Sequence, residues 1–198
     1  LKKKVLIISY NIGSNKTVGG KRWLNYSNIL AKLNHDVYVL STKGNIDYEN
    51  LNNKIKVFSI DSNYPSVLDK IQFDFLDKIQ YKLSKIYLLL LCKGSIYDRS
   101  KRLEHILQKT VNNIITENNI NNIIVSGAPF SLLYYVTKHF KNNTNIISDF
   151  RDPWTKGIGY GMSLLSRKRM KFEKVCEAFV LKYSNNITCA SKDLSLML

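Results

Sequence analysis

The chain has 198 residues, of which 44% are hydrophobic, and a formal net charge of +15. This length allows one domain with a full core but not two ordinary ones, and the regular recurrence of apolar runs excludes a disordered chain. The charge calls for an anionic partner, and nucleic acid, an anionic bilayer or a phosphorylated ligand would each provide one.

The chain begins without a secretory signal, because the apolar run at residues 5–8 is too short for a signal core. The longest apolar stretch, residues 86–92, is far shorter than the roughly 20 residues of a membrane-spanning helix. Cys92, Cys176 and Cys189 form no Cys-x-x-Cys pair, so we interpret them as small buried side chains in a reducing compartment. We therefore expect a cytoplasmic protein, peripheral at the inner face of the cell membrane.

In chain order, short apolar runs predict strands at residues 4–10, 37–41, 55–60, 123–126, 145–150 and 187–190. Apolar residues at helical spacing predict helices at 21–33, 83–92, 103–115, 130–140 and 172–183, and Ser191 is placed to cap another. The helix at 172–183 has an apolar face made of Phe172, Val175, Cys176, Phe179, Val180 and Tyr183. The organisation of residues 63–102 stays open. Alternating strands and helices predict an α/β domain, a Rossmann-like doubly wound parallel sheet with strand order 3-2-1-4-5-6.

In such a sheet, ligands bind beyond the carboxyl ends of the strands, and two small-residue loops follow predicted strands there. Gly19-Gly20 with Arg22 follows the first strand, and glycines before a helix let the backbone approach an anionic ligand. An ordinary flexible loop is an equally good interpretation. Ser126-Gly127-Ala128-Pro129 follows the fourth strand, where a plain turn is the simpler interpretation. The sequence has no P-loop, because Asn15 precedes Lys16-Thr17 where that motif requires glycine. It also lacks the Gly-x-Gly-x-x-Gly fingerprint of nicotinamide binding.

The run Asp149-Phe150-Arg151-Asp152-Pro153-Trp154 follows the fifth strand and is the most unusual of these groups. It places two carboxylates, a guanidinium and an indole at the carboxyl edge of the sheet. A structural Asp–Arg pair with Trp154 as a core anchor is one interpretation. The location, together with the glycines that follow at 157, 159 and 161, favours a functional site.

Together these residues resemble the N-terminal domain of retaining GT-B glycosyltransferases of family four. That family has a glycine pair and an arginine after strand one, a small-residue loop with proline after strand four, and the Asp-Phe-Arg-Asp-Pro-Trp run after strand five. It also has a glutamate that opens a helix leading to a short strand and a serine, matched by Glu177, Lys182, Ile187 and Ser191. The match is specific at 149–154 and 177–191, looser at the first loop, and absent across 63–102.

The resemblance implies that residues 1–198 are the acceptor-side half of a GT-B fold. A nucleotide-sugar donor would bind a second, C-terminal domain that carries two glutamates eight positions apart, a separation that no glutamates have here. The chain ends where a helix has hardly begun, so we expect a fragment that is inactive alone.

The resemblance also implies roles for individual residues, with no metal and no cofactor besides the donor. The donor phosphates would face Gly19 and Gly20, while Asp152 and Arg151 would be catalytic, Asp152 by orienting or deprotonating the acceptor hydroxyl. The residues expected near a saccharide or lipid-linked acceptor are Arg22, Pro129, Asp149 and Trp154, and the Trp154 ring could stack on a sugar.

Lysines alternate with apolar residues at 82–93, and further cations lie at 99–102 and 167–171. A basic, apolar helix of this kind can lie at an anionic membrane surface, although residues 88–91 could instead be core with solvated lysines around them. A nucleic-acid-binding module is the main non-enzymatic alternative, but the sequence has no recognition helix, RNP aromatics or zinc-ligand spacing, so no nucleic acid is expected. A stand-alone lipid-binding or scaffold protein stays open.

Overall fold

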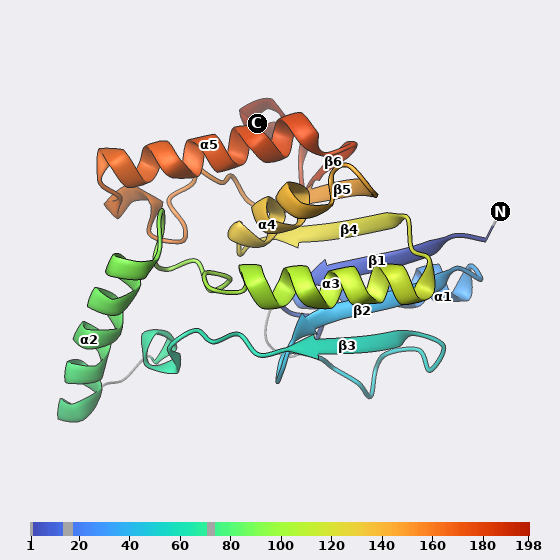
Figure 1. Cartoon of the computed structure of the whole chain (residues 1–198), viewed down its shortest axis with the longest axis horizontal. Helices are drawn as coiled ribbons and strands as arrows, with labels where there is room; N and C mark the ends of the chain where they lie inside the picture. Colours follow the sequence, from blue (N-terminus) through green and yellow to red (C-terminus); the bar gives the residue numbers. More distant parts are fainter. Residues whose placement is uncertain (1, 14–17, 71–73) are drawn as a thin grey trace.

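A computed structural model describes residues 2–13, 18–70 and 74–198. The Lys16-Thr17 pair considered above lies outside these ranges. Six parallel strands form one sheet in the order β3-β2-β1-β4-β5-β6, which confirms the predicted topology (Figure 1). The strands are β1 (Lys4–Ser9), β2 (Asp36–Thr42), β3 (Lys56–Ile60), β4 (Asn122–Gly127), β5 (Asn145–Phe150) and β6 (Asn186–Cys189). Each lies within one residue of its predicted ends, because apolar runs buried on both faces mark parallel strands clearly.

The helices cover both faces of the sheet, as a doubly wound fold requires. They are α1 (Val18–Lys32), α2 (Phe75–Leu91), α3 (Glu104–Asn118), α4 (Ser131–Phe140), α5 (Arg167–Tyr183) and α6 (Lys192–Met197), with single 3-10 turns at Ser66–Asp69 and Met162–Leu164. In Figure 1, α3 lies in front of the strands and α1 behind them. Successive residues of β1 therefore point into different cores: Val5 and Ile7 pack with Trp23 of α1, and Leu6 and Ile8 belong to the larger core with α3 and α4.

Three predicted helices need correction. Helix α2 begins at Phe75, eight residues before the predicted start. Helix α1 begins at Val18, three residues before the predicted start, so Gly19 and Gly20 lie in its first turn. Helix α5 begins at Arg167, five residues before the predicted start, and buries only part of the predicted apolar face. Cys176 and Val180 of that face are buried, whereas Val175 is 58% exposed, and Glu173 is buried although it was not expected to be. The reason is chemical: Glu173 accepts three hydrogen bonds from core donors. Val175, two residues later and roughly 200° around the helix, then faces solvent.

Helix α2 stands apart from the sheet, beyond the carboxyl ends of the strands (Figure 1). Asp74 caps its start by accepting from the Asp77 amide at 2.7 Å, and Arg169 of α5 holds its end by donating to the carbonyls of Leu89 and Cys92. Only Asp77 and Leu88 of the helix are buried, and Leu90 is 81% exposed. The alternative in which residues 88–91 are core therefore holds for Leu88 alone. Across the described residues, no helix combines the length and the apolarity needed to cross a membrane.

Candidate functional site

Asp149 connects three strands and a helix at the carboxyl edge of the sheet. The strand register sets Ser126 of β4 and Thr188 of β6 on either side of it. Its buried carboxylate accepts from the hydroxyl of Ser126 at 2.8 Å and from that of Thr188 at 2.9 Å, and it forms an ion pair with Arg22 of α1. Both carboxylate oxygens thus have partners within the protein, so the contribution of Asp149 is to hold Arg22 in place.

Arg22 and Arg151 bring two guanidinium groups to the start of α1. Arg22 forms its ion pair with Asp149 through Nη2, while its Nε is buried and has no hydrogen-bond acceptor within the described ranges. The Arg151 guanidinium lies directly over Gly19, so a Cβ atom on that residue would overlap it. Gly19 is therefore required for close contact with an arginine, and the space predicted for a ligand above this glycine holds a cation. Amide groups of a first helical turn and two arginines make this edge attractive to an anion.

Asp152 differs from Asp149 although the two are three residues apart. Its side chain is 52% exposed, and it forms a long ion pair with Arg151, whose Nη2 lies 3.8 Å from Oδ2. At that distance the pair is weak and leaves the carboxylate open to a reactant. Asp152 is thus the carboxylate of the motif that has room for chemistry.

Pro129 and Trp154 were both expected beside an acceptor, and both are buried. Pro129 follows two consecutive cis peptide bonds, Gly127–Ala128 and Ala128–Pro129, and the loop is joined to β5 by the Arg151 amide, which donates to the Gly127 carbonyl at 3.3 Å. Trp154 is 1% exposed and stacks on Phe130, with ring centroids 5.2 Å apart. Its ring is occupied by the core and does not face open solvent where a sugar could stack, so the core-anchor interpretation describes it better.

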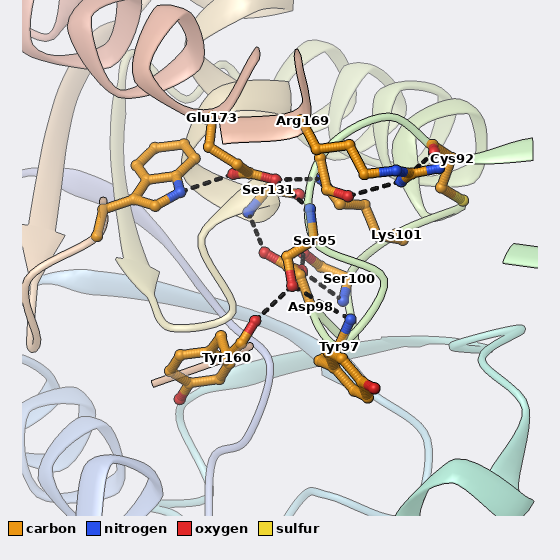
Figure 2. A network of polar contacts seen from close by, with 12 residues as sticks. Cys92, Ser95, Tyr97, Asp98, Ser100, Lys101, Ser131, Tyr160, Arg169 and Glu173 are labelled. Carbon is orange, nitrogen blue, oxygen red and sulfur yellow. Dashed lines mark hydrogen bonds and ion pairs between the residues drawn. The ribbon is translucent and has the colours of Figure 1, made fainter. Parts of the chain in front are cut away.

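Sequence reasoning missed the network that anchors Trp154, which lies in the segment 92–102 and on α5. The fully buried Glu173 accepts from Trp154 Nε1 at 2.8 Å, from the Ser95 amide at 2.6 Å and from Lys101 Nζ at 3.3 Å (Figure 2). Gly94 has a φ of +73°, and a Cβ atom there would overlap the Glu173 carboxylate. The chain therefore needs glycine at this position to bring the segment against α5.

A second buried carboxylate, Asp98, fixes the same segment to α4. It accepts from the amide and hydroxyl of Ser100, a local turn, and from the Ser131 amide at 2.8 Å in the first turn of α4 (Figure 2). The Asp-x-Ser spacing is readable in the sequence, and so is a glutamate beside the apolar positions of α5. These two signals could have located the network.

Glu177, which was predicted to open a helix, lies instead in the middle of α5. Its carboxylate accepts hydrogen bonds from the amide and the hydroxyl of Thr155. It ties the loop after Trp154 to α5. Serine 191 does cap α6, by accepting from the Leu194 amide at 3.2 Å, as predicted.

The three cysteines are free thiols, of which Cys176 is buried and Cys92 and Cys189 are half-buried. Burial raises the pKa of the Cys176 thiol to about 12 and also raises the pKa values of the other two. The thiolate form is therefore disfavoured at neutral pH. In the part of the chain that the structure describes, no three His, Cys, Asp or Glu side chains are grouped so that they could hold a metal ion.

No known family model matches the chain, and no curated protein sequence matches it. A solved structure of UDP-galactose 4-epimerase is similar over 93% of this chain and 75% of its own, with 8% identity and a TM-score of 0.36. A similarity this weak carries no argument about function. The strand order and the helices on both faces identify the chain as a Rossmann-like α/β domain.

Proposed function

We propose that this domain is the acceptor-binding half of a retaining GT-B glycosyltransferase, which transfers a sugar from a nucleotide-sugar donor to a saccharide or lipid-linked acceptor. One observation carries the proposal. The half-exposed Asp152 lies beside an Arg151 guanidinium that covers the first turn of α1. A carboxylate open to a hydroxyl and cations suited to a departing diphosphate thus occupy the edge where ligands of such sheets bind.

In this proposal the donor binds mainly to a second domain, and its diphosphate faces Gly19, Gly20 and Arg151. The amides of α1 and the Arg151 guanidinium stabilise the negative charge that grows on the leaving diphosphate. Asp152 orients the acceptor hydroxyl or accepts its proton. Neither step calls for a metal ion.

The four residues expected near the acceptor differ in exposure, and the roles we propose for them differ accordingly. Arg22 contacts the acceptor through a side chain that is one quarter exposed, and Asp149 acts indirectly by holding Arg22. Pro129 and Trp154 act as the packed support of the loops above them.

We also propose that the domain works at an anionic membrane surface, with α2 as the contacting element. Leu83, Leu90 and Leu91 are exposed on this helix, and Lys78 and Lys82 have no carboxylate partner among the described residues. Apolar side chains with nearby lysines suit a bilayer interface, whereas leucines this exposed are unfavourable on a nucleic-acid-binding face.

The test is Asp152→Asn in a protein that contains both this domain and the donor domain. Nucleoside diphosphate release is measured over a panel of nucleotide sugars with a membrane extract as the source of acceptors. We expect turnover to fall by about 100-fold or more, as for loss of a general base, with an unchanged melting temperature. Asp61→Asn is the matched control, because Asp61 is similarly exposed and also pairs with one cation, Lys43 at 3.0 Å.

Normal turnover with a lowered melting temperature would assign Asp152 to anchoring Arg151 instead. Wild-type behaviour in both measurements would remove the motif from the site altogether.

A further inference from the structure

A cavity of about 670 Å³ lies between α3, α4 and α5 and the segment 91–102. None of Gly19, Arg22, Arg151 or Asp152 lines it. Its volume is that of a small-molecule site. The network of Glu173 and Asp98 holds the segment that forms its rim.

The cavity has an excess of positive charge. Lys93, Lys101, Arg102 and Lys138 line it, against the single carboxylate of Glu104. Lys138 donates to Glu104 at 2.6 Å, and Lys101 is neutralised by the buried Glu173.

Two of these cations have no carboxylate partner in the described ranges, namely Lys93 and Arg102. Arg102 is held over the Tyr87 ring of α2, with its guanidinium carbon 5.0 Å from the ring centroid. Two cations without a carboxylate partner, both lining one cavity, are a suitable site for a phosphate group.

Burial raises the pKa of Glu104, but hydrogen bonds from Lys138 and His139 outweigh burial and lower it overall. Glu104 therefore stays ionised near neutral pH and keeps Lys138 engaged, so Lys93 and Arg102 are the cations left for a ligand.

A second cavity of about 530 Å³ shares Leu91, Cys92, Lys93 and Phe172 with the first. Its lining is more apolar and includes Leu89, Leu90 and Val175, together with the cations Lys93, Lys168, Arg169 and Lys171. All three apolar side chains are exposed, so hydrocarbon placed there would remove them from water. Both cavities are thus lined by cations, and the second adds exposed apolar side chains that the first lacks.

We infer that these two adjoining cavities together bind one anionic membrane phospholipid, with its phosphate between Lys93 and Arg102 and its acyl chains against Leu90, Leu91 and Val175. Cations and exposed leucines lie close together in these cavities, and this combination favours a phospholipid. A free phosphate would leave the leucines exposed, and an uncharged lipid would leave the cations without an anionic partner. The site is separate from the proposed transferase site and does not depend on that activity. It adds specific recognition of one headgroup to any general attraction of α2 for a bilayer.

The test uses dihexanoyl phosphatidic acid below its critical micelle concentration, titrated calorimetrically into the chain. We expect saturable binding of one lipid per chain. Lys93→Gln and Arg102→Gln should each weaken binding by roughly tenfold or more, since each removes one charge-assisted contact. Lys109→Gln is the matched control, because Lys109 is an exposed cation of α3 outside both cavities. Because Arg102 also touches α2, the Lys93 variant keeps the test informative if Arg102→Gln lowers stability.

The apolar wall is tested on α2 itself. Leu91→Asn should weaken binding of the monomeric lipid, while Leu83→Asn should not, because these leucines are 59% and 61% exposed but only Leu91 lines the cavities. Equal binding of glycerol 3-phosphate would overturn the lipid assignment, and equal binding of dihexanoyl phosphatidylcholine would overturn the role of the cations. Absence of saturable binding, or equal losses in the control variants, would reject the site.

Discussion

The carboxyl edge of the sheet and helix α2 carry positive charge in opposite ways. At the sheet edge, Arg22 is paired with a buried aspartate, and nearby Lys101 with a buried glutamate. On α2, Lys78 and Lys82 stand at the surface beside exposed leucines. The first arrangement holds each cation against a buried carboxylate, whereas the second leaves the lysine side chains free to meet an outside surface.

This contrast separates residues that determine stability from residues that determine partners. Changes in the buried pairs should lower the melting temperature, and changes on α2 should leave it alone.

Glu173→Gln should have the largest effect on stability. The Lys101 and Glu173 side chains are 4% and 0% exposed, so the change leaves Lys101 charged and uncompensated in the core and breaks the anchor of Trp154. The expected loss is about 3–5 kcal/mol, measured by urea denaturation. Glu117→Gln, on the surface of α3, serves as the control. A loss within the range of ordinary surface changes would show that the segment 92–102 is held by other contacts.

Gly19→Ala should separate stability from activity. An added Cβ would displace the Arg151 guanidinium, so in the transferase we expect turnover to fall by about 100-fold, equivalent to about 2.7 kcal/mol. Stability should be unchanged or higher by up to about 1 kcal/mol, because alanine favours a helix. Gly159→Ala, where a Cβ meets nothing within 4 Å, should change neither property. Unchanged turnover in Gly19→Ala would break the link between this contact and catalysis.

Asp149→Asn should destabilise the domain by about 1–3 kcal/mol. The effect is smaller than at Glu173 because the Arg22 side chain is 26% exposed and water can solvate it. The substituted amide also keeps one oxygen, which can still accept a hydrogen bond from the hydroxyl of Ser126 or Thr188. Thermal melts of this variant and of Asp61→Asn provide the comparison, and equal melting temperatures would contradict a structural role for the ion pair.

The double change Leu83→Asn with Leu90→Asn should have the smallest effect on stability, within about 0.5 kcal/mol, since both side chains are already exposed. The double change should instead strongly decrease the amount of protein that sediments with vesicles of phosphatidylcholine and phosphatidylglycerol. Exchange of two polar surface residues of α3, Gln108→Asn with Asn112→Gln, is the control. A large drop in melting temperature would mean that α2 packs against the domain in solution.

The strands were predictable to within a residue, whereas the candidate site was predictable only in part. Asp149, Arg151 and Asp152 stand together in the sequence, but whether each is buried depends on strands distant along the chain. Ser126 and Thr188 reach Asp149 only through the sheet register, and no local pattern encodes that meeting. Trp154 was ambiguous for the same reason, because its partner Phe130 belongs to another loop.

By itself, the sequence determined the order of strands and helices, the parallel sheet and the position of the motif at its carboxyl edge. Periodicity and apolar runs are local properties, so they can be read from the sequence without knowing which residues are neighbours in space. Only the tertiary structure decided that Gly19 lies against Arg151, that Glu173 and Asp98 fasten the segment 92–102, and that α2 leaves all of its leucines except Leu88 exposed. Those outcomes depend on which distant groups satisfy a buried charge or cover an apolar face, and that is settled when the chain packs.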